Sequence, residues 1–256
     1  MNRTYIKDLR TKVDQTVKIQ GWLQTLRDQK KIQFLILRDP TGLVQVAHWK
    51  PNDEDLAARI ASMGMETALT ITGKVIDNPV VKLNQIEIQL ESLVVENAAE
   101  IPLPFEPFAE TLPALDYRLD WRYMDLRRPY NNLLFQVETT LEMAMREYWL
   151  QHNFVEIHSP KLTGSPSESG AELFSLDYFE RKAYLAQSPQ FYKQMAMAAG
   201  FERIFEIGPV FRADPSFTAR HMTEFTGVDM EISWIDSHED VRSEEHTSEL
   251  QSRQVI

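Results

Sequence analysis

Hydrophobic and polar residues alternate between residues 17 and 96 with the two-residue period of half-buried strands. Five segments carry this period, at 17–28, 31–39, 42–49, 67–77 and 84–95. A stretch with helical spacing, about 54–63, separates the third segment from the fourth. Five strands with one helix between the third and the fourth is the order of an OB-fold barrel, which commonly holds single-stranded nucleic acid on its second and third strands.

The pattern changes after residue 100. Residues 101–117 contain four prolines and no clear period, which indicates a connector. Apolar residues at helical spacing then predict a helix over 131–151, followed by a strand over 154–162 that Pro160 closes. Further segments predict a hairpin at 173–187, a helix that begins with Ser188 as N-cap and Pro189 as its first residue, and strands at 203–212 and 224–231.

These elements predict an α+β protein in which the second domain has an antiparallel sheet, because strands and helices do not alternate regularly. The expected organisation is a barrel over 1–100, a connector over 101–128 and a second domain over 129–241. Residues 242–256 form a separate polar tail.

Composition and charge narrow the classes of function. The chain has 256 residues, no cysteine and six histidines without paired metal-ligand spacing, which argues against disulfides and against a cysteine or histidine metal site. Its net charge is −11, yet residues 1–50 hold ten Lys or Arg against four Asp or Glu. A polyanion should therefore meet the barrel. The first ten residues lack the apolar core of a signal peptide and no apolar run could span a bilayer, so we expect a cytoplasmic protein without a membrane partner.

The segment 211–231, FRADPSFTARHMTEFTGVDME, brings cationic, acidic and aromatic side chains together in a short stretch of the chain. Strand alternation places Glu206, Gly208, Val210 and Arg212 on one face, and Phe225, Gly227, Asp229 and Glu231 on one face of the returning strand. Guanidinium groups suit phosphate and an aromatic face suits a purine, so the segment is interpreted as a nucleotide site. The alternative is an internal salt bridge between Arg212 and Glu206 or Glu231, with Phe225 in the core.

Two neighbouring features extend this site. Gln190 and Lys193 are three residues apart on the predicted helix and share one face, where they could bind a small carboxylate. A solvated lysine on an exposed helix is the alternative. His221 follows Arg220 in the polar loop and is a candidate phosphate contact.

The segment 211–231 resembles motif 2 of the class II aminoacyl-tRNA synthetases, and residues 1 to about 241 resemble the archaeal and eukaryotic type of aspartyl-tRNA synthetase. The helix and strand that end at Pro160 resemble motif 1, which builds the homodimer interface in that family. The barrel resembles the anticodon-binding domain. The resemblance implies a ligase that activates aspartate with ATP and transfers it to tRNA.

The resemblance also implies a role for each matching residue. Arg212 would hold the α-phosphate of ATP and act in catalysis, and the other ATP contacts would be Asp214, Arg220, His221 and Phe225. The aspartate contacts would be Ser167, Glu168, Gln190, Lys193 and Asp229. Phe34 and Gln45 would stack on and hydrogen-bond to anticodon bases, with Arg27 nearby in the anticodon-binding site. Magnesium is expected, but its main acidic ligands would lie in the family's carboxy-terminal part, the remaining sheet strands and motif 3, which we expect this chain to lack.

Lys193 favours aspartate over asparagine, because a neutral amide has no need of a cation and asparaginyl enzymes lack a lysine there. Three positions depart from the family pattern: Asp214 stands where Glu is usual, Ser169 where Gly is usual, and Gln24 where enzymes strict for one tRNA often carry a bulkier residue. Charging of the asparagine tRNA as well as the aspartate tRNA therefore stays open.

The resemblance ends near Val241. RSEEHTSELQS at 242–252 matches the translation of a common sequencing adapter, so we expect 242–256 to be an assembly artefact and the fragment to be inactive as written. The nucleotide sequence across codons 241 and 242 tests this, because a read without the adapter string contradicts it. The alternatives are a non-catalytic, truncated tRNA-binding module and an asparaginyl-type or asparagine-forming relative.

Overall fold

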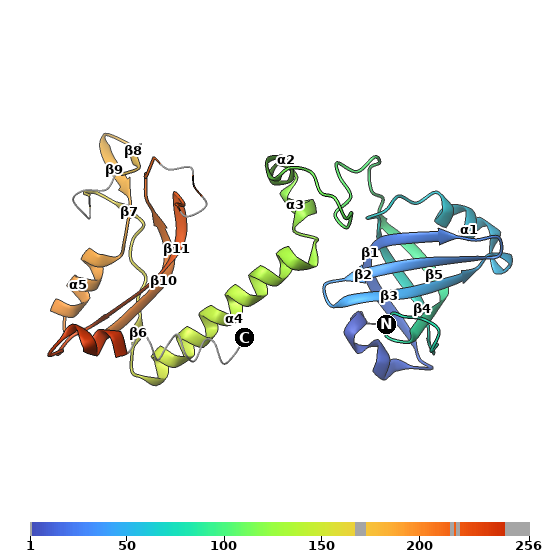
Figure 1. The fold of residues 1–256 in the computed structure, drawn as a ribbon, viewed down its shortest axis with the longest axis horizontal. Helices are drawn as coiled ribbons and strands as arrows, with labels where there is room; N and C mark the ends of the chain where they lie inside the picture. Colours follow the sequence, from blue (N-terminus) through green and yellow to red (C-terminus); the bar gives the residue numbers. More distant parts are fainter. Residues whose placement is uncertain (1, 167–172, 216–217, 219–220, 244–256) are drawn as a thin grey trace. The chain divides into compact units, whose positions relative to one another are not determined.

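The computed structural model describes all residues except 1, 167–172, 216–217, 219–220 and 244–256 (Figure 1). It divides into two compact units, Met1–Met124 and Asp125–Ile256. Most of the predicted connector, 101–128, thus belongs to the first unit. Within the described part of the chain, no helix has both the length and the apolar character needed to cross a membrane.

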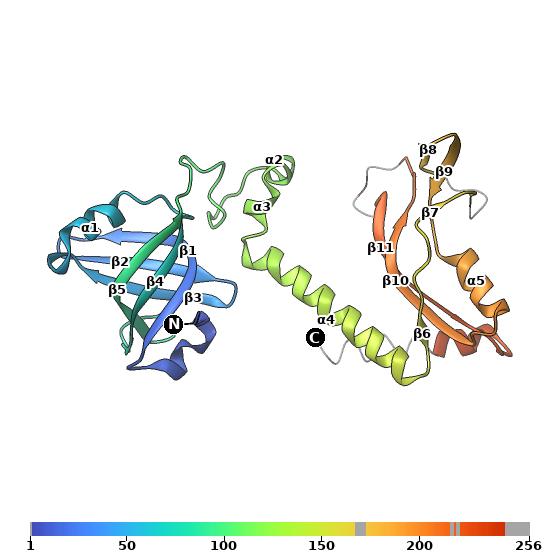
Figure 2. The same cartoon turned by 180° about the vertical axis from the view of Figure 1, so that it is seen from behind.

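The first unit is a closed five-stranded barrel with the strand order β1-β2-β3-β5-β4 (Figures 1 and 2). Its strands are β1 (Thr16–Asp28), β2 (Ile32–Asp39), β3 (Gly42–Trp49), β4 (Ala68–Asp77) and β5 (Ile86–Asn97). The helix α1 (Glu54–Ala61) lies between β3 and β4 in the sequence, and the short 3-10 helices are η1 (Ile6–Lys12) and η2 (Lys50–Asn52). The predicted OB-fold is confirmed, with strand ends within two residues of the sequence pattern.

One long strand closes the barrel. The first half of β1 pairs with β4 from Thr16 to Trp22, and its second half pairs with β2 from Trp22 to Asp28. Gly21 permits this close approach, because a Cβ there would lie 2.2 Å from the carbonyl oxygen of Arg38. The interior is filled by aliphatic side chains that are at most 1% exposed, including Ile19, Leu23, Leu35, Leu37, Val44, Val46, Ile71 and Ile88.

Arg38 of β2 forms a buried ion pair within the barrel and also contacts the connector. The guanidinium of Arg38 donates hydrogen bonds of 2.9 and 2.7 Å to the two carboxylate oxygens of Glu66, whose side chain is 3% exposed. The Arg38 Cζ also lies 4.5 Å from the ring centroid of Phe108. Phe108 belongs to the irregular segment that leads to α2 (Leu115–Asp120) and α3 (Arg122–Asp125).

The second unit places the long helix α4 (Pro129–Gln151) beside a three-stranded sheet with the order β11-β10-β6. β10 (Arg203–Phe211) runs antiparallel to β11 (Glu224–Ile232) and parallel to β6 (Val155–Glu156). Its small core contains Tyr148, Trp149, Phe154, Phe205 and Ile207. The α+β class is confirmed, although within this sheet β10 and β6 form a parallel pair.

A second sheet has the order β7-β9-β8, with β7 (Leu162–Thr163), β8 (Ser175–Tyr178) and β9 (Arg181–Leu185). The single strand predicted over 154–162 is therefore wrong, because β6 and β7 belong to different sheets. Pro160 lies between them, and it has no N–H to continue a ladder.

The helix α5 (Gln190–Ala198) begins one residue later than predicted. Pro189 is its N-cap residue rather than its first helical residue. The Ser188 hydroxyl accepts the Gln190 N–H at 3.2 Å, so the serine still satisfies one backbone donor at this helix end.

Candidate functional site

The pairing of β10 with β11 builds the floor of the candidate site. Cross-strand neighbours are Ile204 and Glu231, Glu206 and Asp229, Gly208 and Gly227, and Val210 and Phe225. The even positions of β10 and the odd positions of β11 thus share one face, as the alternation predicted. The glycine pair places no side chain at the centre of this face, and a Cβ at Gly227 would be in ordinary contact with Val210 and Asp229, at 3.5 and 3.7 Å.

Lys193 is buried above one end of this face. Its ammonium lies 2.9 Å from Oδ1 of Asp229 and 3.1 Å from Oε2 of Glu231, and it donates to the carbonyl oxygen of Met230 at 3.3 Å. The side chain is 4% exposed, so the alternative of a solvated surface lysine is wrong. Gln190 lies on the same helix and is half-buried.

A second lysine holds the neighbouring acid. Glu206 is 2% exposed, and its Oε1 accepts hydrogen bonds from Lys161 Nζ at 2.6 Å, from Ser159 Oγ at 3.0 Å and from Ser159 N at 3.2 Å. Sequence reasoning placed Glu206 on this face but missed Lys161. Two features of the sequence could have pointed to Lys161. A buried carboxylate such as Glu206 needs a cationic partner, and Lys161 directly follows Pro160, which was predicted to close a strand.

Arg212 and Phe225 lie together at the other end of the face. The Arg212 Cζ is 5.4 Å from the Phe225 ring centroid, and both residues are exposed. The ion pairs of Glu206 and Glu231 are with Lys161 and Lys193, so the suggested internal bridge to Arg212 is not formed. An exposed ring likewise excludes Phe225 from the core.

The loop between the two strands is only partly described. Asp214 follows the end of β10 and is half-buried, while exposed His221 has its Nδ1 2.7 Å from Oγ1 of Thr218. Arg220 lies outside the described residues, and so do Ser167 and Glu168.

The barrel carries a separate groove of about 570 Å³. The predicted residues Arg27, Phe34 and Gln45 line it, together with part of the segment between β4 and β5. An Arg27 N–H donates to Gln45 Oε1 at 3.0 Å, and the Arg27 Cζ lies 5.5 Å from the Phe34 ring centroid. Glu87, which sequence reasoning missed, accepts a hydrogen bond from Gln45 Nε2 at 2.6 Å. The three predicted residues are thus brought together.

The helix α4 presents many exposed apolar side chains. Five of these are at least 51% exposed: Leu133, Leu134, Phe135, Met143 and Leu150. Pro160, predicted at a dimer interface, is also exposed.

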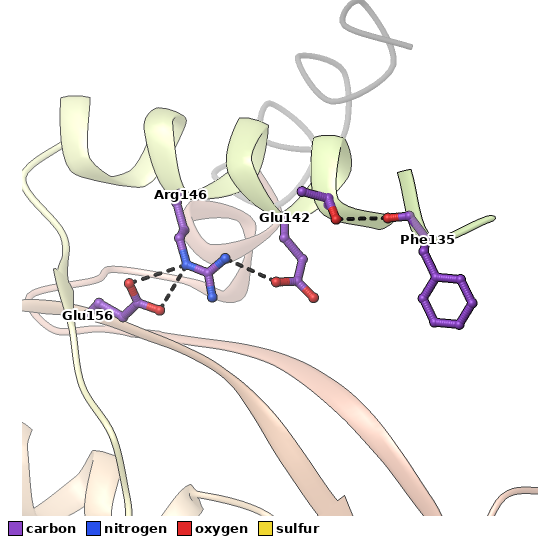
Figure 3. Close-up of polar contacts among 5 residues, drawn as sticks. Phe135, Glu142, Arg146 and Glu156 are labelled. Carbon is purple, nitrogen blue, oxygen red and sulfur yellow. Dashed lines mark hydrogen bonds and ion pairs between the residues drawn. The ribbon is translucent and has the colours of Figure 1, made fainter. Parts of the chain in front are cut away.

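Arg146 fixes α4 to β6 (Figure 3). It bonds Glu142 on its own helix at 3.0 Å and Glu156 on β6 at 3.0 Å. Partial burial opposes its charge, but the hydrogen bonds that the guanidinium donates to Glu142 and Glu156 outweigh burial and raise its pKa. The helix is therefore held to the sheet by a charged side chain as well as by the aromatic core.

Two family models match this chain, one over the barrel and one over the part that contains the β10–β11 sheet. Residues 114–249 match the family model "tRNA synthetases class II (D, K and N)", and residues 17–96 match "OB-fold nucleic acid binding domain". The chain is 43% identical over 239 residues to the aspartate–tRNA(Asp) ligase of Picrophilus torridus, covering 93% of this chain and 55% of that protein. It is also 43% identical over 235 residues to the aspartate–tRNA(Asp/Asn) ligase of Methanocaldococcus jannaschii, covering 91% of this chain and 53% of that protein.

Two solved structures share the fold. Asparaginyl-tRNA synthetase from Pyrococcus horikoshii, complexed with asparaginyl-adenylate, gives a TM-score of 0.91 at 30% identity, over 99% of this chain and 58% of that one. A putative aspartyl-tRNA synthetase from Leishmania major gives 0.90 at 30% identity, over 98% and 52%. The chain spans about half the length of the curated relatives that it matches. On these matches and on the barrel and sheet described above, the chain belongs to the class II tRNA synthetases of the D, K and N group.

Proposed function

We propose that the protein represented by this chain is an aspartate–tRNA ligase. The observation that carries the proposal is the buried ammonium of Lys193, held by Asp229 and Glu231 at the edge of the bare glycine pair. A fixed cation beside a fixed carboxylate suits a small zwitterion with an additional carboxylate. The 43% identity to aspartate–tRNA ligases supports the same substrate.

In the first step, an oxygen of the aspartate α-carboxylate attacks the α-phosphorus of ATP, and pyrophosphate leaves. Arg212 stabilises the charge on the α-phosphate, since a guanidinium is an effective donor to phosphate oxygens. Phe225 stacks on adenine beside it. Asp214, Arg220 and His221 belong to the loop that borders ATP. The chain's contribution is therefore to position and neutralise the reacting groups.

The aspartate end of the site lies over Lys193 and Asp229. Lys193 binds the side-chain carboxylate, Asp229 accepts the ammonium group, and Gln190 donates from the adjacent turn of α5. Ser167 and Glu168 would close over the amino acid. In the second step, a hydroxyl of the terminal adenosine of tRNA attacks the acyl carbon, and AMP leaves.

The barrel groove is assigned to the anticodon. Phe34 offers a stacking surface, Gln45 offers hydrogen bonds to base edges, and Arg27 offers a cation to the RNA backbone, which is how single-stranded RNA is usually held. Arg27 makes no ion pair within the described part of the chain. Its charge is therefore available to RNA.

Three further assignments follow from the family. The exposed apolar residues of α4 and Pro160 are assigned to a homodimer interface. Magnesium would accompany ATP, but the described residues contain no group of three or more acidic or histidine side chains that could hold a metal ion. We assign no step to magnesium here. A cytoplasmic location is proposed because translation takes place there.

A variant of this proposal is dual charging of the aspartate and asparagine tRNAs. It is favoured by the relative named as an Asp/Asn ligase at 43% identity. Aspartylation of purified asparagine tRNA distinguishes the two forms, because a strict enzyme leaves that tRNA uncharged.

Aspartate-dependent ATP–pyrophosphate exchange by the full product of the gene tests the proposal. Lys193→Met should abolish exchange, because the substrate carboxylate loses its cation and Asp229 loses its partner. Lys182→Met is the matched control, since Lys182 is an exposed lysine that pairs with Asp177 on the second sheet. Exchange that depends on asparagine instead of aspartate would overturn the assignment.

A further inference from the structure

The glycine pair at the centre of the floor has a cation beside it that the proposed roles do not use. A Cβ built on Gly208 would lie 3.6 Å from Nζ of Lys161 and 3.4 Å from Oε1 of Glu206. Lys161 therefore reaches over the same sheet face as Asp229. Its side chain is 23% exposed, whereas that of Glu206 is 3% exposed, so the lysine and not the acid can be reached from solvent.

The ammonium of Lys161 has one donor left. A lysine ammonium carries three N–H groups. One is donated to Glu206 at 2.6 Å and one to Ser159 Oγ at 3.0 Å. No other acceptor for Lys161 occurs among the residues that the structure describes. The two acceptors come from the segment before Lys161 and from β10, and together they fix the direction of the third N–H.

The position of Lys161 along the floor identifies the group it would meet. Glu206, its partner, lies directly across from Asp229. Arg212 and Phe225 lie at the opposite end of the glycine pair. In an amino acid the ammonium and the α-carboxylate are attached to one carbon. A substrate whose ammonium contacts Asp229 and whose activated end points towards Arg212 therefore places its α-carboxylate over the glycines.

We propose that Lys161 is an additional substrate-binding residue, which donates a hydrogen bond to the α-carboxylate of the amino acid. Glu206 and Ser159 act as positioning residues, because they hold the ammonium over Gly208. The inference rests on the proposed function. It does not depend on which amino acid is used, since every amino acid carries an α-carboxylate.

The alternative role of Lys161 is to compensate the buried charge of Glu206. Removing only the lysine would leave a carboxylate without its cation, and that alone is destabilising. A double variant separates the two roles. Lys161→Met combined with Glu206→Gln removes both charges and restores neutrality at this position.

The experiment measures the KM for aspartate in ATP–pyrophosphate exchange and the thermal unfolding midpoint, with the full product of the gene. Lys161→Met should raise the KM about 10- to 100-fold, the effect of losing one charge-assisted hydrogen bond. Lys161→Arg should recover part of this loss because it keeps a cationic donor. Lys182→Met should leave the KM unchanged, because Lys182 is an exposed lysine that has no assigned contact with the substrate.

The decisive result is the KM of the double variant. If Lys161 binds substrate, the KM stays raised although the unfolding midpoint recovers. A return of the KM to within about twofold of the unsubstituted value overturns the inference, because compensation of Glu206 would then be the only role. If the unsubstituted protein shows no exchange with aspartate but does so with another amino acid, the aspartate assignment fails, and the same variants test Lys161 with that amino acid. Absence of exchange with every amino acid overturns both proposals.

Discussion

The barrel groove and the β10–β11 floor differ in how their charged side chains are paired. In the barrel, the Arg38–Glu66 pair is buried away from the groove, and the groove itself exposes Arg27, whose hydrogen-bond acceptor among the described residues is the neutral amide of Gln45. On the floor, two lysines and three carboxylates form adjacent pairs on one sheet face. An unpaired cation next to an aromatic ring suits a long polyanion with bases. Fixed charges of both signs suit a small zwitterion.

The largest expected effect tests the buried half of this contrast. Arg38→Met should lower the free energy of unfolding of the barrel by about 3–5 kcal/mol, because the buried Glu66 carboxylate loses the guanidinium that compensates its charge. Urea denaturation followed by tryptophan fluorescence measures it. Arg10→Met is the control, since the Arg10–Asp77 pair is about half exposed and should contribute no more than about 1 kcal/mol. Equal losses for the two variants would contradict the contrast.

The groove is tested next. Phe34→Ala should weaken binding of an anticodon stem-loop RNA by about 1–3 kcal/mol, the usual contribution of one stacked base. The dependence of affinity on salt should stay the same, because no charge is removed. Fluorescence anisotropy over a salt series measures both. Trp49→Ala removes an exposed aromatic ring of β3 that does not line the groove, and should bind RNA normally.

Arg27→Gln should have the complementary effect. Loss of one phosphate contact is expected to reduce the slope of log affinity against log salt by about 0.7 for single-stranded RNA. Affinity at low salt should fall across all RNA sequences alike. An unchanged slope with lost sequence preference would instead assign Arg27 to a base edge.

The smallest expected effect concerns the partly exposed network on α4. Arg146→Met should lower the unfolding free energy of the second unit by about 1 kcal/mol, because its two carboxylate partners are themselves partly solvated. Chemical denaturation followed by near-ultraviolet circular dichroism measures it. Lys182→Met breaks an exposed pair and should give no measurable change. If Arg146→Met lowered the unfolding free energy as much as Arg38→Met, solvent exposure would not determine how much these ion pairs contribute to stability.

The barrel could be predicted from the sequence because each strand has one buried face, so alternation reports burial directly. The same rule placed Glu206 and Asp229 on one face. It failed for 154–162, where two strands of two residues each are too short to produce a period.

The partners of the floor charges were less predictable. The contact between Lys193 and Asp229 joins residues 36 positions apart, and that between Lys161 and Glu206 joins residues 45 positions apart. Spacing along one element carries no information about such contacts. The burial of Lys193 likewise depends on how α5 packs, which its own sequence does not determine.

The double pairing of β1 has a consequence for synthesis on the ribosome. Strand β1 needs β4, which ends at Asp77, and β4 needs β5, which ends at Asn97. The strands of the barrel are therefore complete only after about one hundred residues have left the exit tunnel. We expect the barrel to fold while the β10–β11 sheet is still being made.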